Sequence, residues 1–156
     1  MNNSKGFSLL ELVTVIAVIG ILMGVATPMF TDIQIEARKA VVRQNAQALE
    51  AGLDMIKYKQ IAANTDTLGF PDGEVFTVNE MGIPHYTDGA VFDEAMCLNI
   101  WNTALERSPP TGITGVLTYN VEAVTVGELE LCKYVFQEEP TLFVVLNLDN
   151  GVVSHY

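Results

Sequence analysis

The chain begins with an apolar pattern that has no helical or strand periodicity. Leu12 to Thr31 is a run of twenty residues without a charged side chain, and most of it reads LVTVIAVIGILMGVA. About twenty apolar residues in a helix match the roughly 30 Å hydrocarbon core of a bilayer. The run therefore predicts a membrane-spanning helix over residues 7–29.

A cleaved secretory signal is the alternative to a membrane span. The apolar region of such a signal is usually about 7 to 15 residues long and ends in a small-x-small cleavage site. Gly24-Val25-Ala26 offers a weak site of this kind, but the helix-favouring sequence continues past Pro28, so we favour the span. Lys5 in the leader MNNSKG places this end in the cytoplasm and the C-terminal part across the membrane, by the positive-inside rule.

From Thr31 to about Ala63 the apolar positions become periodic. One set is spaced 4, 3, 4 and 3 residues apart, which places it on one face of a helix: Val42, Ala46, Leu49, Leu53 and Ile56. The pattern predicts an amphipathic stem helix over residues 30–63 that carries a head on this face.

The other side of the predicted stem is charged. Its residues are Glu36, Arg38, Lys39, Arg43, Glu50, Lys57 and Lys59. An ordinary solvated helix face is the favoured interpretation. The alternative is that the basic cluster Arg38, Lys39 and Arg43 meets the acidic heads of neighbouring chains.

Residues 64–156 predict a small head of mixed structure. The stretch from 66 to 93 is rich in Gly, Pro, Asp and Thr, as loops are, around a short strand at Glu74 to Val78. Asp93 is suited to cap a helix that runs to about Glu106, with Trp101 in the core. Strands follow at 116–126, interrupted or bulged, and at 131–136, 142–148 and 152–156, with a hairpin turn at 149–151. The expected fold is α+β: a long N-terminal helix packed on an antiparallel sheet.

Charge is divided unevenly between the stem and the head. Residues 1–59 carry five acidic and six basic side chains, whereas residues 60–156 carry fourteen acidic side chains against Arg107 and Lys133, a net charge of −12. So acidic a surface repels phosphate backbones, which argues against nucleic acid as a partner. The 156 residues suffice for one head and no second domain.

The head contains two cysteines, Cys97 and Cys132, and neither stands in a CxxC pair. Zinc and thioredoxin-like sites are therefore unsupported. A disulfide is favoured if the head lies outside the cytoplasm, and two buried free thiols are the alternative.

We expect no enzyme, metal or cofactor. His85 and His155 lack metal-ligand spacing, and no nucleophile elbow, phosphate loop or carboxylate dyad occurs. Asp66, Asp72 and Glu74 lack the order of a calcium loop, and a solvated acidic loop is favoured.

Glu11 is the one charge inside the apolar helix. No lysine or arginine lies between Phe7 and Arg38, so no cationic side chain of the same helix can reach it. A cut between Gly6 and Phe7 would create an α-amino group one helical turn before Glu11. Glu11 would then pair with this amine or with that of a neighbouring chain, unless it simply reaches the interface.

These residues resemble the signal of type IV prepilins and of type II secretion pseudopilins. The string KGFSLLELVTVIAVIG has Gly6 before the cut, Phe7 after it and Glu11 as the fifth residue of the processed chain, and Pro28 stands at the family's helix kink. The resemblance implies cleavage by a prepilin peptidase, N-methylation of Phe7, and pairing of Glu11 with a neighbouring N-terminus. It implies a type IV pilin fold and no catalysis.

Two further features refine this resemblance. The short leader and Phe7 look like the type IVa group, and DIQIEARKAVV and CLNIW look like pilins of the mannose-sensitive haemagglutinin type. Gly20 and Gly24 form a GxxxG that permits close helix packing, and Gly24 also precedes Pro28 by one turn, where helix melting is the other interpretation.

Three functions are consistent with these features. A pilin would leave the inner membrane, with its N-terminus cytoplasmic, and polymerise with itself and other pilins into a surface fibre for adhesion or motility, through inner-membrane assembly machinery. A pseudopilin of type II secretion is the second. The third, a single-pass membrane protein with a ligand-binding head, does not account for the Gly6-Phe7 junction.

Overall fold

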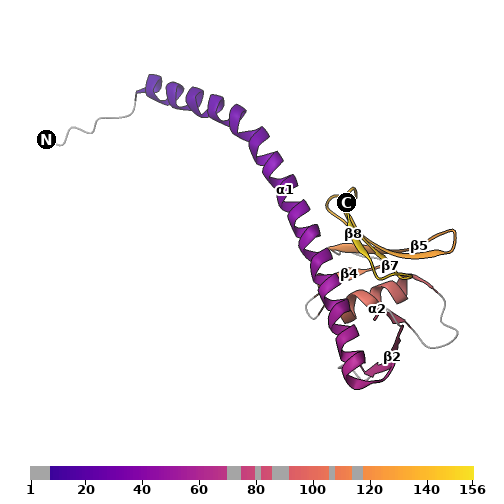
Figure 1. Ribbon diagram of the computed structural model, residues 1–156. Helices are drawn as coiled ribbons and strands as arrows, with labels where there is room; N and C mark the ends of the chain where they lie inside the picture. The colour runs from indigo at the N-terminus through magenta and orange to yellow at the C-terminus, as the bar shows by residue number, and fades with distance from the viewer. Residues whose placement is uncertain (1–7, 70–74, 80–81, 86–91, 106–107, 114–117) are drawn as a thin grey trace. The chain divides into compact units, whose positions relative to one another are not determined.

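The computed structural model describes residues 8–69, 75–79, 82–85, 92–105, 108–113 and 118–156. It divides into two compact units, Met1–Arg38 and Lys39–Tyr156. The elements, shown in Figure 1, are α1 (Leu9–Ala63), β1 (Thr67–Gly69), β2 (Val75–Val78), β3 (Pro84–His85), α2 (Glu94–Ala104), β4 (Thr111–Gly112), β5 (Tyr119–Val126), β6 (Leu129–Phe136), β7 (Phe143–Asn147) and β8 (Val153–His155).

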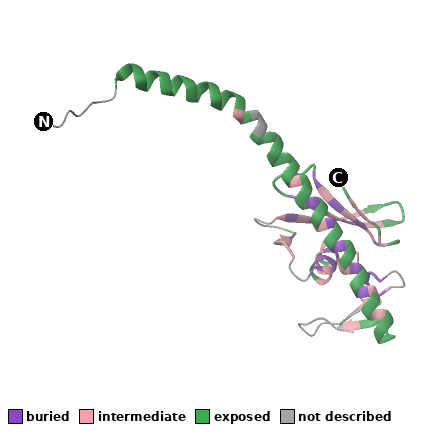
Figure 2. Cartoon of the chain, turned by 60° about the vertical axis from the view of Figure 1, so that its left-hand side comes forward, coloured by how far each residue is buried: buried purple, intermediate pink, exposed green. Residues whose placement is uncertain are grey.

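The C-terminal half of α1 has one buried stripe. It consists of the five residues that the sequence placed on one helix face: Val42, Ala46, Leu49, Leu53 and Ile56. In Figure 2 this half of α1 is purple along one side and green along the rest. The predicted amphipathic pattern is therefore confirmed. The first four residues of the stripe belong to one core cluster with the sheet and α2, and Ile56 belongs to a second cluster with Val78.

Helix α2 begins and ends close to the predicted residues. The Asp93 carboxylate accepts a hydrogen bond from the Met96 N–H at 2.8 Å, which caps the first turn as expected. The helix ends at Leu105, which is buried, and its inward face carries Cys97, Ile100 and Trp101. Trp101 is fully buried, so its predicted place in the core is confirmed.

The larger sheet has the strand order β4-β5-β6-β7-β8. Strands β5 to β8 form an antiparallel meander, as predicted, and the Gly151 N–H donates to the Asn147 carbonyl at 2.9 Å in the expected hairpin turn. Between β5 and β6 the chain turns at Gly127, which has φ +66°, a conformation that glycine adopts without strain.

The predicted interruption or bulge in the first strand of the meander is wrong over its described part. Strand β5 pairs with β6 without a break from Tyr119 opposite Phe136 to Val126 opposite Leu129. Its inner side chains Tyr119 and Val121 are buried while their neighbours are half-buried, so the first half of the strand alternates regularly. The expected residues 116 and 117 lie outside the described part of the chain.

Short strands were missed by the sequence analysis. Strand β4 pairs in parallel with β5, and β1, β2 and β3 form a separate three-stranded antiparallel sheet. Only β2 was expected, and Glu74 of that prediction lies outside the described residues. Strands of two or three residues are too short to show a period of two, so their pairing depends on the tertiary structure. The α+β fold class itself is confirmed.

Candidate assembly site at the start of helix α1

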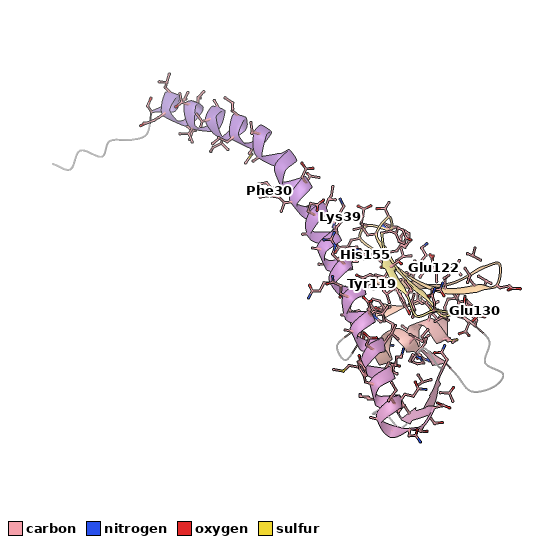
Figure 3. All side chains as sticks on the ribbon, in the orientation of Figure 1. Phe30, Lys39, Tyr119, Glu122, Glu130 and His155 are labelled. Atoms are coloured by element: carbon pink, nitrogen blue, oxygen red, sulfur yellow. A yellow bond between two sulfur atoms is a disulfide. The ribbon has the colours of Figure 1, made fainter. Side chains whose placement is uncertain are left out.

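The N-terminal unit presents an apolar surface that its own residues leave uncovered. Among the side chains described from Ser8 to Ala37, all but Ala26 are exposed, and Ala26 is intermediate. Leu9 is 81% exposed, and Phe30, which projects from the helix in Figure 3, is 65% exposed. So continuous an apolar exposure indicates a surface that lipid or other protein chains cover.

The polar groups inside this segment are satisfied by the helix itself. The hydroxyls of Thr14, Thr27 and Thr31 each donate to the carbonyl four residues earlier, at 3.1, 2.7 and 3.3 Å. Such bonds let threonine lie in hydrocarbon without an unpaired hydroxyl. In the described part of the chain, α1 is the one helix long and apolar enough to cross a membrane, a test that a signal sequence also passes.

Glu11 lies in the first turn of α1, where it takes part in a capping box. The Ser8 hydroxyl accepts from the Leu10 N–H at 3.3 Å, and the Glu11 carboxylate accepts a long hydrogen bond from the Ser8 N–H at 3.5 Å. This reciprocal arrangement is the S-x-x-E pattern that satisfies free N–H groups at a helix start. Glu11 also gains from the positive end of the helix dipole.

The capping box was missed by the sequence analysis, although SLLE at residues 8–11 carries its signal. The box gives Glu11 a hydrogen-bond donor inside its own chain, the backbone N–H of Ser8. That partner is a neutral N–H at the long end of the hydrogen-bonding range, so it supplies no positive charge to the carboxylate.

The structure places the remaining predicted site residues unevenly. Gly6 and Phe7 lie outside the described residues, so cleavage and methylation there stay predictions. Gly24 and Pro28 lie within α1, which is helical across both, and the kink or melting stays a prediction. A Cβ added at Gly20 or Gly24 would meet nothing within 4 Å, so the unit itself does not require these glycines.

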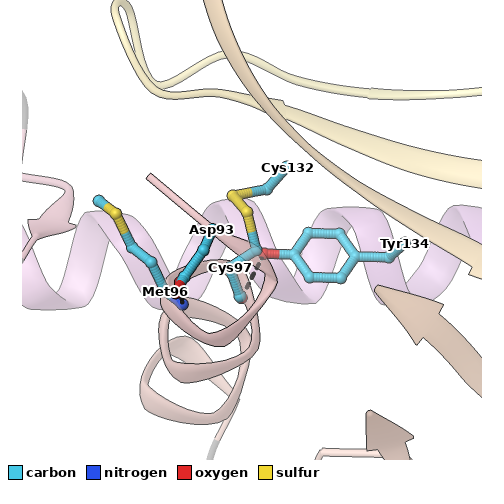
Figure 4. Close-up of a disulfide and its surroundings, with 5 residues drawn as sticks. All are labelled: Asp93, Met96, Cys97, Cys132 and Tyr134. Carbon is cyan, nitrogen blue, oxygen red and sulfur yellow. Dashed lines mark hydrogen bonds between the residues drawn. A yellow bond between two sulfur atoms is a disulfide. The ribbon is translucent and has the colours of Figure 1, made fainter. Parts of the chain in front are cut away.

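Cys97 and Cys132 form a disulfide with a Cα–Cα distance of 5.4 Å, and both are fully buried. The bond joins α2 to β6, as Figure 4 shows. Beside it, the Tyr134 hydroxyl donates to the Cys97 carbonyl at 2.8 Å. The site is therefore a structural link inside the head.

Aromatic rings surround the disulfide. The Trp101 ring centroid lies 4.4 Å from that of Tyr134 and 5.2 Å from that of Tyr119. Burial raises the pKa of Tyr134 well above its ordinary value of 10.0. Burial also raises the pKa of Tyr119, and the hydrogen bond that Asn45 donates to its hydroxyl opposes part of this rise.

The described part of the head contains no group of three or more His, Cys, Asp or Glu residues placed to hold a metal ion. Asp72 and Glu74 of the considered calcium loop lie outside the described residues. An open hollow of about 510 Å³ adjoins the C-terminal end of α1, lined by Lys57, Gln60, Ile61, Asn64, Thr65 and Asp66.

Comparison with known proteins identifies the N-terminal segment. Residues 1–27 match the family model of the prokaryotic N-terminal methylation motif. The chain is 35% identical over 72 residues to "Type IV narrow pilus major component PilA5" of Thermus thermophilus, a match that covers 45% of this chain and 62% of that protein. No solved structure matches.

The chain thus carries a prepilin-type methylation motif and is similar in sequence to a type IV pilin. The matched regions are a methylation motif and part of a pilus component. They do not distinguish the mannose-sensitive haemagglutinin type from other pilins.

Proposed function

We propose that the chain is a structural subunit of a type IV pilus that polymerises through helix α1. The observation that carries this proposal is the exposed apolar segment from Leu9 to Phe30 with a single carboxylate, Glu11, at its start. Such a segment is stable in a bilayer or in a bundle of identical helices, and an intramolecular core gives it no cover.

Processing would supply the cation that Glu11 lacks. In this proposal a prepilin peptidase cuts between Gly6 and Phe7, and the new amine of Phe7 is methylated, as the matched motif at residues 1–27 suggests. The amine of one subunit then pairs with Glu11 of its neighbour, because an ion pair between chains in an apolar surrounding fixes their register. Before assembly the subunits lie in the inner membrane with the N-terminus in the cytoplasm. They leave the membrane through the assembly machinery.

A secretion pseudopilin would use the same helix. The similarity to a major pilus component favours the pilus, as do the disulfide and a head of about 90 residues, residues 64–156 in our division of the chain. Electron microscopy of cells with a labelled head separates the candidates: long surface fibres support the pilus, short periplasmic assemblies the pseudopilin, and no assembly a protein that does not polymerise.

Substitution of Gly6 tests the processing step. Gly6→Leu should leave the leader attached and the chain in the membrane, because the peptidase needs a residue without a side chain before the cut. N-terminal sequencing reads the outcome, and Gly20→Leu is the matched control, since it makes the same change within the apolar helix, far from the cut. A Gly6→Leu chain that begins at Phe7 would refute the proposal.

Substitution of Glu11 separates its charge from its role in the capping box. Glu11→Gln removes the charge but keeps a side chain that can complete the box, and it should lower fibre yield at least about tenfold because it leaves the neighbour's amine unpaired. Ser8→Ala removes the capping hydroxyl and keeps the charge, so fibre yield should stay within about threefold of the unchanged chain. Equal losses in the two variants would mean that Glu11 acts as a cap and not as an assembly group.

A further inference from the structure

One flank of α1, within the C-terminal unit, carries two pairs of like charges. Lys39 and Arg43 form a basic pair, and Glu50 and Asp54 form an acidic pair. Their spacing of 4, 7 and 4 residues keeps all four within about 60° on one side of the helix, beside the buried stripe. All four side chains are exposed.

The arrangement is unfavourable for an isolated helix. Residues three or four apart are neighbours on a helix, and like charges at this spacing are destabilising. The one charged neighbour of Arg43 at such spacing is Lys39, and the one charged neighbour of Glu50 is Asp54. Asp54 and Lys39 differ, because Lys57 lies three residues after Asp54 and Glu36 lies three residues before Lys39.

The described part of the head offers no charge partner to Arg43, Glu50 or Asp54. Within the part of the chain that the structure describes, no ion pair or hydrogen bond of Arg43, Glu50 or Asp54 is found, whereas Lys133 and Glu122 do pair, at 2.9 Å. Arg43 and Glu50 therefore lack an oppositely charged partner both at helical spacing and in the described head.

We infer that this charged flank is a contact between the stems of two copies of the chain. The basic pair of one stem faces the acidic pair of its neighbour, and the inference rests on the proposed polymerisation. A second copy is the occupant because the flank carries both halves of a complementary pattern. The pair centres are eleven residues apart, so two parallel stems offset by about 16 Å along their axes bring them together.

The stem contact replaces the acidic head as the partner of the basic cluster. A head contact would satisfy Arg43 but would leave Glu50 beside Asp54 without a cation. A stem contact satisfies both pairs at once. These pairs are exposed, so they set register and specificity more than they add affinity, and salt weakens them.

Charge exchange tests the contact in the full, processed chain. At this offset Arg43 faces Asp54, so Arg43→Glu should raise the critical concentration for fibre assembly about fivefold, and Asp54→Arg should do the same. The double variant Arg43→Glu/Asp54→Arg should return to within about twofold of the unchanged chain. Lys59→Glu is the matched control, because it makes the same charge change on another side of the helix and should have little effect.

The outcomes separate this contact from its competitors and from the proposed function. Rescue of Arg43→Glu by Glu128→Lys or Glu130→Lys on the head, and not by Asp54→Arg, would overturn the stem contact in favour of the head. An unchanged chain that forms no fibres would overturn the polymerisation and the contact together. Fibres whose assembly is unaffected by Arg43→Glu would overturn the contact alone.

Cross-linking tests the contact without any substitution, so its result does not depend on whether a variant folds. Carbodiimide joins a lysine amine directly to a carboxylate, so fibres of unchanged chains, mixed from two isotope labels, should yield Lys39 linked to Glu50 or Asp54 of the other label. Links between labels from Lys39 to head residues alone would contradict the inference.

Discussion

The two halves of helix α1 differ in how far their side chains are buried. Between Ser8 and Ala37 the described side chains make no buried contact, whereas from Val42 onward one stripe enters the core. The first half is apolar on every side, and the second is apolar on one. A helix that is apolar all round needs an apolar surrounding, and an amphipathic helix needs only one packed face. Folding of the head is therefore an intramolecular event, and the first half is stabilised by lipid or by other subunits.

The comparison predicts that stability and assembly respond to different substitutions. Changes in the core of the C-terminal unit should lower the free energy of unfolding of the head. Changes in the N-terminal unit should alter processing or assembly and leave the head as stable as before.

Removal of the disulfide should have the largest effect on the head. Cys97→Ala/Cys132→Ala opens a loop with a sequence separation of 35 and should cost about 4 kcal/mol, because the unfolded chain gains conformational entropy. Denaturant unfolding of the full chain in detergent, followed by near-ultraviolet circular dichroism of the aromatic cluster, measures it. N-terminal processing should be unchanged. A processing defect would contradict the claim that head stability and processing depend on different halves of α1.

Gly52 and Gly20 allow the same substitution to be compared in the two halves of α1. A Cβ at Gly52 would collide with the backbone carbonyl of Ala104, which cannot move without displacing α2. Gly52→Ala should therefore cost about 2 kcal/mol of head stability, as overpacking does.

The matched variant Gly20→Ala places the same methyl group in open space in the first half. It should leave the unfolding of the head unchanged and should favour the helix slightly. Equal losses of head stability in the two variants would show that the halves do not act independently.

Substitution of Tyr134 should have a smaller effect, and one that depends on pH. Tyr134→Phe removes the hydrogen bond to the buried Cys97 carbonyl and should cost about 1 to 2 kcal/mol at neutral pH. Burial raises the pKa of Tyr134 in the folded state above 10.0, so the folded head binds more protons than the unfolded chain at higher pH. The stability is fully present below pH 10 and falls as the pH rises above it.

The alkaline branch of the stability curve checks this sign. In Tyr134→Phe the decrease above pH 10 should be shallower, with the remainder coming from Tyr119, whose pKa is also raised. Tyr58→Phe is the control, because Tyr58 is 69% exposed. A curve equally steep in both variants would contradict the role given to Tyr134.

The longest patterns in the sequence predicted the fold correctly. The buried stripe from Val42 to Ile56, the helix capped by Asp93 and the turn at Asn150 each depend on local periodicity or on a local side-chain preference. Strands β1, β3 and β4 were not predictable, because pairs of two or three residues depend on which segments the rest of the fold brings together.

The candidate site shows the same division. The sequence alone determined that Glu11 is a lone charge in an apolar helix without a cation of its own, because this is a matter of composition and order along the chain. Only the tertiary structure decided that Gly52 must lack a side chain and that Tyr134 bonds the Cys97 carbonyl, since both depend on backbone contacts between distant segments. It also decided that the described part of the head leaves Arg43 and Glu50 unpaired, because burial and ion pairing follow from which side of α1 the head covers.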